Sequence, residues 1–330
     1  MQTITMKSKK KILILGATGF IGLNLTLYFS KNNNYEVHAV RFRSNKINIK
    51  GVRWHKADLR NYNKTEKLLN NIDVVIQAAA TTSGSKDIIN NPYLHVTDNA
   101  VMNSYILKAV FKNKVEHFIF LSCSVMYKSS KKPIKENEYK INSKIDSNYF
   151  GVGNTKVYIE NMCKFYSKIC ETKFTTIRHS NIYGPFDKFD FEKSHFFGAT
   201  ISKVMLSEKN IVVWGQGEES RDLLYIDDLI NFIQSVITHQ KSNFRIYNCG
   251  LSKAYSIDKI VKKIIKISKK KLKIHYDSSK PNIKTSIFLD TSLAYKEIRW
   301  KPMTSLDNGI IKTIKWWRKN INNKNLKLKK

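Results

Sequence analysis

Residues 11–22, KILILGATGFIG, decide the fold of this chain. The apolar run predicts a buried strand, and the glycines that follow it stand at the start of a helical pattern. Gly16 permits a tight turn, and Gly19 lets the backbone approach a pyrophosphate, which the N–H groups of a helix N-terminus can bind. The stretch therefore predicts a phosphate cradle for a dinucleotide. We expect this cradle to be formed by Gly16, Thr18, Gly19, Phe20, Ile21 and Gly22.

Strand-like and helical patterns alternate through the first half of the chain. EVHAV, DVVIQAAA, HFIFLSC and FTTIRHS are short apolar runs, and helix-period segments separate them, one of them over residues 154–170. This alternation predicts an α/β fold with a Rossmann-type doubly wound parallel sheet that helices cover on both faces. After residue 181 the pattern loosens, which indicates a smaller, interleaved C-terminal α/β lobe.

The length of 330 residues favours a division into two units. We expect residues 10–180, together with about 222–248, to form the dinucleotide-binding domain. Residues 181–221 and 249–317 would then form the substrate lobe, and residues 318–330 a basic tail.

The formal net charge of +32 is the most unusual feature of the composition. The cations are scattered, and the sequence shows no helix-turn-helix, zinc finger or stacked-aromatic RNA motif, so we expect no nucleic-acid partner. A positive field would nevertheless attract a nucleotide diphosphate. The sequence has neither an apolar run of about eighteen residues nor a secretory signal, which predicts a cytoplasmic protein without a membrane partner. The four cysteines show no zinc-type spacing, so we expect no metal.

AVRFRSNK, residues 39–46, bears on the choice of cofactor because it ends the second predicted strand. An acidic residue there would hydrogen-bond the ribose 2′-OH of NAD, whereas arginines suit the 2′-phosphate of NADP. Arg41 and Arg43 occupy this stretch, and no Asp or Glu does. NADP is therefore the expected cofactor. NAD stays as the alternative, because two arginines in so basic a chain can also be surface charge.

Several segments accompany the glycine spacing Gly-x-x-Gly-x-x-Gly: AAATT (78–82), the Lys156 helix, RHSNIYGPFD (178–187), VVWGQGEESRDLLYIDDL (212–229) and YNCG (247–250). With them the chain resembles, from about residue 10 to 317, the extended short-chain dehydrogenases/reductases of the NAD-dependent epimerase/dehydratase family. Within that family it is most similar to the GDP-L-fucose synthases. The resemblance implies further cofactor contacts at Asp58, Leu59, Ala78, Ala79, Ala80, Asn99 and Lys156.

A Ser/Thr, a Tyr and a Lys couple hydride transfer to proton transfer in that family. The lysine binds the nicotinamide ribose and lowers the pKa of the tyrosine, which acts as general acid/base. Lys156 occupies the lysine position when it is counted from the motifs on both sides. The tyrosine position, four residues earlier, holds Val152, and Cys123 stands at the Ser/Thr position beside Ser124. An alkyl side chain cannot titrate, so the set departs from the family pattern.

Two further residues are candidates for the missing proton transfer. Tyr149 lies one helical turn before Val152 and would project near the same face, although it could also be a packing aromatic. His195 stands where the resemblance places the histidine of a Cys/His pair that epimerises carbons next to a keto group, whereas Val125 replaces its cysteine. The candidate catalytic residues are Lys156, Tyr149, Cys123, Ser124 and His195.

The substrate side depends mainly on the segment 212–229. The resemblance implies a nucleotide-diphosphate sugar, and it alone favours a GDP-sugar. Arg221 would form a charge-assisted hydrogen bond with the pyrophosphate. Trp214 would either pack beside the base or belong to the hydrophobic core. The expected substrate contacts are Asn181, His195, Lys203, Trp214 and Arg221.

The combination predicts an NAD(P)-dependent nucleotide-diphosphate-sugar epimerase/reductase with a variant catalytic set. The alternative is a non-catalytic or regulatory nucleotide-sugar/NADP-binding protein, which the joint loss of Tyr and Ser/Thr supports. Members of the family commonly pair through the lysine helix and the helix before it, so the resemblance implies a homodimer.

Overall fold

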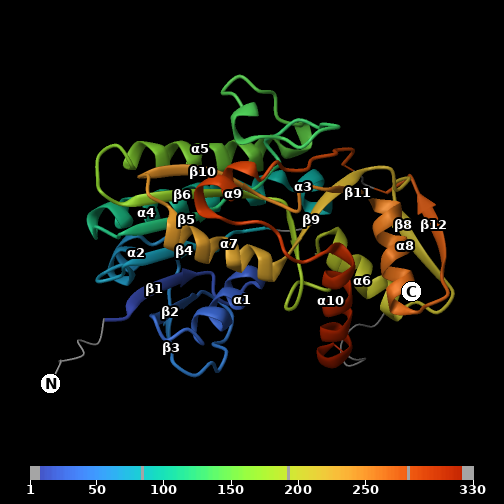
Figure 1. The fold of residues 1–330 in the computed structure, drawn as a ribbon, viewed down its shortest axis with the longest axis horizontal. Coiled ribbons are helices and arrows are strands. Elements are labelled where there is room, and N and C mark those ends of the chain that lie inside the picture. Colours follow the sequence, from blue (N-terminus) through green and yellow to red (C-terminus); the bar gives the residue numbers. More distant parts are fainter. Residues whose placement is uncertain (1–7, 83–84, 192–193, 281–282, 322–330) are drawn as a thin grey trace.

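The computed structural model describes residues 8–82, 85–191, 194–280 and 283–321 (Figure 1). Most of the expected basic tail, residues 322–330, lies outside these described residues. Within the described ranges, no helix is long and apolar enough to cross a membrane.

A seven-stranded parallel sheet with the order β10-β6-β5-β4-β1-β2-β3 forms the larger part of the molecule. Its strands are β1 (Lys10–Leu15), β2 (Tyr35–Arg41), β3 (Val52–Lys56), β4 (Val74–Gln77), β5 (His117–Leu121), β6 (Lys173–His179) and β10 (Phe244–Cys249). The central strands β4 and β5 are buried along their whole length, as expected when helices cover both faces of a parallel sheet. The predicted Rossmann-type doubly wound sheet is therefore confirmed.

Alternate residues of β1 divide the core of this sheet into two layers. Ile12 and Ile14 pack in one cluster with Phe29, whereas Leu13 and Leu15 pack in the other with Ile106. The first face is covered by α1 (Phe20–Phe29) and α7 (Ile226–His239), and the second by α2 (Tyr62–Leu68), α4 (Thr97–Lys112) and α5 (Phe150–Tyr166).

The smaller lobe lies beyond the carboxyl end of β6, on the right of Figure 1. It contains a three-stranded sheet of β11 (Ala254–Ser256), β9 (Ser220–Tyr225) and β7 (Asn181–Tyr183), and a pair of β12 (Lys273–Asp277) and β8 (Asn210–Trp214). Its helices are α6 (Phe196–Leu206), α8 (Ile257–Ser268) and α10 (Leu306–Asn320). Shorter elements are α3 (Ser85–Asn90), α9 (Ser292–Ile298) and the 3-10 helices η1 (Pro92–His95), η2 (Glu136–Glu138) and η3 (Ser147–Tyr149). The chain returns to the large sheet through α7 and β10, which makes the lobes interleave.

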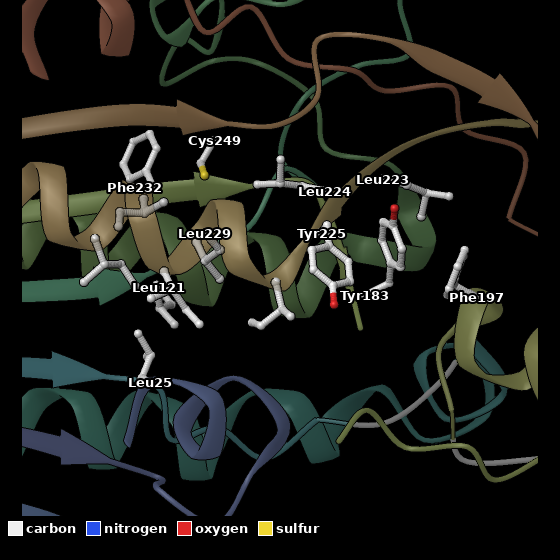
Figure 2. Close-up of a cluster of buried hydrophobic side chains, with 14 of the residues drawn as sticks. Leu25, Leu121, Tyr183, Phe197, Leu223, Leu224, Tyr225, Leu229, Phe232 and Cys249 are labelled. Carbon is white, nitrogen blue, oxygen red and sulfur yellow. The ribbon is translucent and has the colours of Figure 1, made fainter. Parts of the chain in front are cut away.

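One hydrophobic cluster joins the two lobes. Figure 2 shows it passing from Leu25 of α1 and Leu229 of α7 to Phe197 of α6. The ring centroids of Tyr183 and Phe197 are 4.2 Å apart, and those of Tyr183 and Tyr225 are 5.6 Å apart. The smaller lobe is thus packed directly against the sheet rather than attached by a linker.

The helix that carries Lys156 begins earlier than the sequence predicted. It was expected over residues 154–170, and the structure has it at Phe150–Tyr166. Both glycines of its first turn are required by packing, because a Cβ on Gly151 would lie 2.9 Å from Val96 and one on Gly153 would lie 2.9 Å from Ile145. Close tertiary contacts therefore compensate for the low helix propensity of glycine, which the sequence alone could not reveal.

Candidate functional site

A cavity of about 410 Å³ lies at the carboxyl ends of β1, β2 and β4. Ligands of doubly wound sheets bind at this edge. Its walls include most of the residues that the sequence predicted for the cofactor: Gly16, Thr18, Gly19, Arg41, Arg43, Asp58, Leu59, Ala78, Ala79 and Ala80.

The glycine turn fits a close approach of a pyrophosphate. Gly16 has φ +76°, and a Cβ on it would lie 2.6 Å from the Cα of Ala79. Gly22 is equally restricted, since its Cβ would lie 2.2 Å from the Gly16 carbonyl oxygen. Helix α1 starts after Gly19 without a capping side chain and without an acidic residue in its first turn, so its N-terminal N–H groups suit an anion. The residues present therefore fit a dinucleotide.

The side chains of Phe20 and Ile21 do not line this cavity. Both pack against the main hydrophobic cluster instead. These two residues, with Gly22, could reach a phosphate only through their backbone.

The predicted contact Asn99 also lies behind the wall of the cavity. Its amide accepts from Thr81 N at 3.0 Å and donates to the carbonyl oxygens of Thr81 and His95 at 2.9 and 3.0 Å. Because Thr81 does line the cavity, Asn99 supports the wall from behind.

An arginine cluster surrounds Phe42 at the outer end of the cavity. The guanidinium carbons of Arg43 and Arg60 lie 5.0 and 5.5 Å from the Phe42 ring centroid. Arg60 donates to both carboxylate oxygens of Asp58 at 3.0 and 2.8 Å, and it also pairs with Asp98 at 3.0 Å. The hydrogen bond from Arg60 lowers the pKa of Asp58, which keeps that carboxylate ionised.

Sequence reasoning did not single out Arg60. In the sequence, Arg60 is distinguished only by standing two residues after Asp58, an expected cofactor contact, and such a spacing is common by chance. Its two carboxylate partners come from separate turns of the chain, and only the folded structure shows that both are within reach.

A second cavity, of about 160 Å³, lies against the smaller lobe. Every predicted substrate residue lines it: Asn181, His195, Lys203, Trp214 and Arg221. Tyr149, a predicted catalytic residue, lines it too. The structure therefore brings together residues from η3, β7, the start of α6, β8 and β9, and two of them, Tyr149 and Arg221, are 72 positions apart in the chain.

Two side chains of this cavity are held by neighbouring groups. The ammonium of Lys203 lies 5.3 Å from the Trp214 ring centroid and donates to the Val212 carbonyl oxygen at 3.1 Å. The amide of Asn181 donates to the Asp222 carbonyl oxygen at 3.1 Å.

The pKa of His195, a third side chain of this cavity, is lowered by desolvation and, to a smaller extent, by the charge of nearby Lys188. The lowered pKa favours the neutral imidazole, which can accept a proton.

Arg221 is anchored by backbone carbonyl groups. It donates to the carbonyl oxygens of Ser220 at 2.9 Å and Ile283 at 3.0 Å, and also to that of Thr285. Burial lowers its pKa, while Tyr149 opposes that shift. An arginine in this position presents a fixed positive charge to the cavity.

Lys156 and Cys123 lie together at the end of β5. The Lys156 ammonium donates to the Leu121 carbonyl oxygen at 2.8 Å and lies 4.7 Å from the Phe120 ring centroid. Burial lowers the pKa of Lys156 and raises that of Cys123, and each group partly opposes the shift of the other. The carbonyl oxygen of Ser124 accepts a hydrogen bond from Tyr127 N at 3.1 Å.

Tyr149 ends η3 and caps the start of α5. Burial raises the pKa of its phenol, whereas the positive charge of nearby Arg221 lowers it. Cys123 also lies close enough to affect this phenol.

His179 is a further titratable residue that sequence reasoning missed. It is the last residue of β6, and its Nδ1 lies 2.8 Å from the Ser180 carbonyl oxygen. Burial lowers its pKa to about 4, with smaller contributions from Lys156 and His195. The motif RHSNIYGPFD contained it, but a polar residue at a strand end carries no distinct signal.

A buried ion pair ties α5 to β6. Arg178 donates to the Glu160 carboxylate at 2.6 Å, with side chains 4% and 3% exposed. Ser122 donates to the same carboxylate at 2.6 Å, and Arg178 also donates to the Tyr127 hydroxyl at 2.9 Å. This network fixes the helix that carries Lys156 to the strand that leads to Asn181.

Within the described residues, no group of three or more His, Cys, Asp or Glu side chains could hold a metal ion.

The fold and these sites define a nucleotide-sugar enzyme class. A model of the NAD dependent epimerase/dehydratase family matches residues 12–250, and the chain belongs to that family. The resemblance expected from the motifs is thus confirmed at the level of the family, whereas the GDP-L-fucose synthase branch is only one among several similar relatives.

Curated relatives carry different activities. GDP-L-colitose synthase of Yersinia pseudotuberculosis is 28% identical, over 95% of this chain and 99% of the relative. GDP-L-fucose synthase of Sinorhizobium fredii is 28% identical, over 81% of this chain and 86% of the relative. UDP-glucuronate 4-epimerase of Thermodesulfobacterium geofontis is 25% identical, over 94% and 96%.

Solved structures show the same arrangement. UDP-glucuronic acid 4-epimerase from Bacillus cereus, in complex with UDP-glucuronic acid and NAD, has a TM-score of 0.81 and 26% identity, over 94% of this chain and 99% of that chain. UDP-glucose 4-epimerase from Thermotoga maritima has a TM-score of 0.84 over 94% and 100% of the two chains, and at 22% identity it supports the fold.

Proposed function

We propose that this protein catalyses NAD(P)-dependent hydride transfer at a sugar carbon of a nucleotide-diphosphate sugar, as an epimerase/reductase. The observation that supports it best is the second cavity, where all five expected substrate residues and Tyr149 meet. In this proposal residues 10–180 with 222–248 bind the cofactor, and residues 181–221 with 249–317 bind the sugar nucleotide.

The cofactor we propose is NADP, with NAD as the alternative. Its pyrophosphate would lie on Gly16, Gly19 and the start of α1, and Arg41 and Arg43 would face a 2′-phosphate. Bound in reduced form, the nicotinamide supplies a hydride to a carbonyl carbon. Lys156 would hold the nicotinamide ribose.

The proton in this proposal comes from Tyr149. Val152 cannot supply one, and Tyr149 is the tyrosine that lines the cavity beside Arg221. The positive charge of Arg221 favours the phenolate that remains after the proton has moved to the substrate oxygen. We propose a GDP-sugar as substrate, in line with the GDP-L-colitose and GDP-L-fucose synthases among the relatives.

NADPH oxidation with a panel of GDP-, UDP- and dTDP-linked 4-keto-6-deoxy sugars tests this proposal. We expect turnover that falls at least about 100-fold in Tyr149→Phe. Tyr295→Phe is the matched control, because this exposed tyrosine lies on α9 away from both cavities. Full activity in Tyr149→Phe would remove Tyr149 from the mechanism.

The second candidate is a non-catalytic nucleotide-sugar and NADP-binding protein. Val152 and Cys123 at the two family positions favour it, because neither provides the usual acid/base chemistry. Tight NADPH binding by calorimetry without turnover of any substrate in the panel would support this candidate over the enzyme.

We also propose a homodimer through α4 and α5. These adjacent helices expose Val101, Phe111, Tyr158 and Phe165, an unusual set for a surface that faces only water. Light scattering after gel filtration should give twice the 38.4 kDa mass of the chain. A monomer at micromolar concentration would contradict this.

A further inference from the structure

Charged side chains line the outer end of the first cavity, that of about 410 Å³. They are three arginines and two aspartates: Arg41, Arg43, Asp58, Arg60 and Asp98. Among the described residues that line this cavity, no others carry a formal charge at neutral pH. The cavity therefore holds one cation more than it holds carboxylates, a balance that suits an anionic ligand.

The two carboxylates come from turns that lie far from the second strand in the sequence. Asp58 follows β3, and Asp98 lies in the first turn of α4. The expectation of NADP came from residues 39–46, where no acidic residue occurs. Carboxylates near the adenosine ribose favour the 2′-OH of NAD and repel the 2′-phosphate of NADP. Without a partner, Asp58 and Asp98 would thus oppose the preference that Arg41 and Arg43 predict.

The guanidinium of Arg60 holds both carboxylates. Its Nε and Nη2 donate to the two oxygens of Asp58 at 3.0 and 2.8 Å. Its Nη1 donates to both oxygens of Asp98 at 3.0 Å. The backbone N–H of Arg60 adds a further hydrogen bond to Asp58 at 3.0 Å. One planar cation is therefore shared between two carboxylates and offsets part of their charge.

The turn that carries Arg60 is anchored on both sides. Asn61 N donates to the Asp58 carbonyl oxygen at 3.0 Å, and the Asn61 side chain caps α2. The Thr65 hydroxyl donates to the Leu59 carbonyl oxygen at 3.1 Å. The backbone under the guanidinium is therefore held in place before any ligand binds.

Arg43 is the cation that this arrangement leaves available. Its guanidinium carbon lies 5.0 Å from the Phe42 ring centroid, and that of Arg60 lies 5.5 Å from the same centroid. Within the part of the chain that the structure describes, Arg43 forms no ion pair. The pKa of Asp58 is lowered first by its hydrogen bond with Arg60 and, to a smaller extent, by the charge of Arg43. Without Arg60, the Asp58 carboxylate would consequently compete with a phosphate for Arg43.

We propose that Arg60 determines the preference for NADP, although two carboxylates occupy it. By offsetting the charge of Asp58 and Asp98, it leaves Arg43 free for the 2′-phosphate. This inference rests on the proposed function and adds a residue on which its choice of cofactor depends. Without Arg60, the two remaining arginines and the two aspartates would carry no net charge, and the preference should shift toward NADH.

Arg60→Gln is the first test variant, because it removes the charge and keeps a polar side chain. We expect its Kd for NADPH to rise about 10-fold and its Kd for NADH to change less than about threefold. Isothermal titration calorimetry of the full chain measures both constants, and binding of NADH also shows that the variant is folded. An equal loss of affinity for the two cofactors would overturn the proposal, because Arg60 would then only support the wall of the cavity.

The double variant Arg60→Gln/Asp98→Asn removes one positive and one negative charge together. We expect it to bind NADPH within about threefold of the wild type, because the charge balance of the cavity is restored. Arg53→Gln is the matched control, since Arg53 pairs with Glu36 at 2.8 Å but does not line this cavity, and it should change neither affinity. A double variant that binds NADPH as weakly as Arg60→Gln would exclude charge as the reason.

Ionic strength gives a readout that a purely structural role would not change. The loss of NADPH affinity in Arg60→Gln should be larger at about 20 mM salt than at about 300 mM, because salt screens charges that are partly exposed. A loss that is the same at both salt concentrations would contradict the proposal.

These measurements need no nucleotide sugar, so they separate this inference from the proposed function. If Arg60→Gln behaves as expected but the wild type turns over no nucleotide sugar, the proposed hydride transfer fails while the role of Arg60 stands. If the wild type turns over a nucleotide sugar and Arg60→Gln keeps the wild-type ratio of NADPH to NADH affinity, the inference fails while the proposed function stands.

Discussion

The two cavities of this molecule are built in different ways. The first cavity, which we propose binds the cofactor, is formed by turns that directly follow β1, β2, β3 and β4, and its wall includes Gly16, Gly19 and several alanines. The second cavity is formed by side chains from η3, β7, α6, β8 and β9, which the chain brings together only after crossing between lobes. The first depends on local backbone shape and the second on the packing of distant elements, so substitutions should affect them differently.

The largest expected effect is at the glycine turn. Gly16→Ala should weaken NADPH binding at least about 100-fold, because the new Cβ would lie 2.6 Å from the Ala79 Cα and displace the wall of the cavity. Gly51→Ala is the matched control, since Gly51 has a similar φ of +78° with no atom within 4 Å of a Cβ. Fluorescence titration with NADPH measures both variants. Equal losses would mean that backbone strain, and not the close approach, limits binding.

The next effect concerns the buried ion pair that ties α5 to β6. Arg178→Met should destabilise the fold by about 3–5 kcal/mol, because it leaves the Glu160 carboxylate buried without its cation. Glu116→Gln, which removes the exposed partner of Lys10, should cost less than about 1 kcal/mol. Urea unfolding compares the two. A loss below about 1 kcal/mol in Arg178→Met would show that α5 does not need this tie to β6.

A smaller effect, on cofactor affinity, is expected at the outer end of the first cavity. Arg43→Ala should reduce affinity for NADPH about 10-fold and leave affinity for NADH unchanged, because one charge-assisted contact to a 2′-phosphate is lost. The exposed Arg53 on β3 gives the control variant Arg53→Ala, which should change neither. Parallel titrations of each variant with NADPH and with NADH measure the two affinities. An equal loss of affinity for both cofactors in Arg43→Ala would show that Arg43 does not distinguish the 2′-phosphate.

The smallest effect is a pH dependence at Asp187, which lies between β7 and α6. Burial raises the pKa of Asp187 to about 7 from an unfolded value of 3.8. Below pH 4 the carboxyl is protonated in both states and costs nothing, and the cost grows as pH rises from about 4 to 7. Asp187→Asn should therefore stabilise the protein more at pH 8 than at pH 5 in urea unfolding. An equal effect at both pH values would show that Asp187 does not titrate in the folded protein across this range.

The sheet and the glycine turn were readable because their signals are local. The apolar runs of β1, β4 and β5 and the glycines after β1 each predict a backbone shape without reference to the rest of the chain. Helix α5 was placed four residues late, since only the packing of Val96 and Ile145 shows why Gly151 and Gly153 stay helical. Arg60 and His179 were not predicted, because what distinguishes each residue is its set of neighbours in the folded structure, which the sequence does not show.

By itself, the sequence determined the fold class, the glycine turn after β1 and the departure of Val152 and Cys123 from the family pattern. It also placed Tyr149 one turn before Val152, but it could not say where the phenol lies. Only the tertiary structure decided that this phenol lines the second cavity together with Arg221. The physical reason is the range of the interactions. Turns and strands depend on neighbouring residues, whereas Arg221 lies 72 positions from Tyr149 and shares a cavity with it only when the lobes pack together.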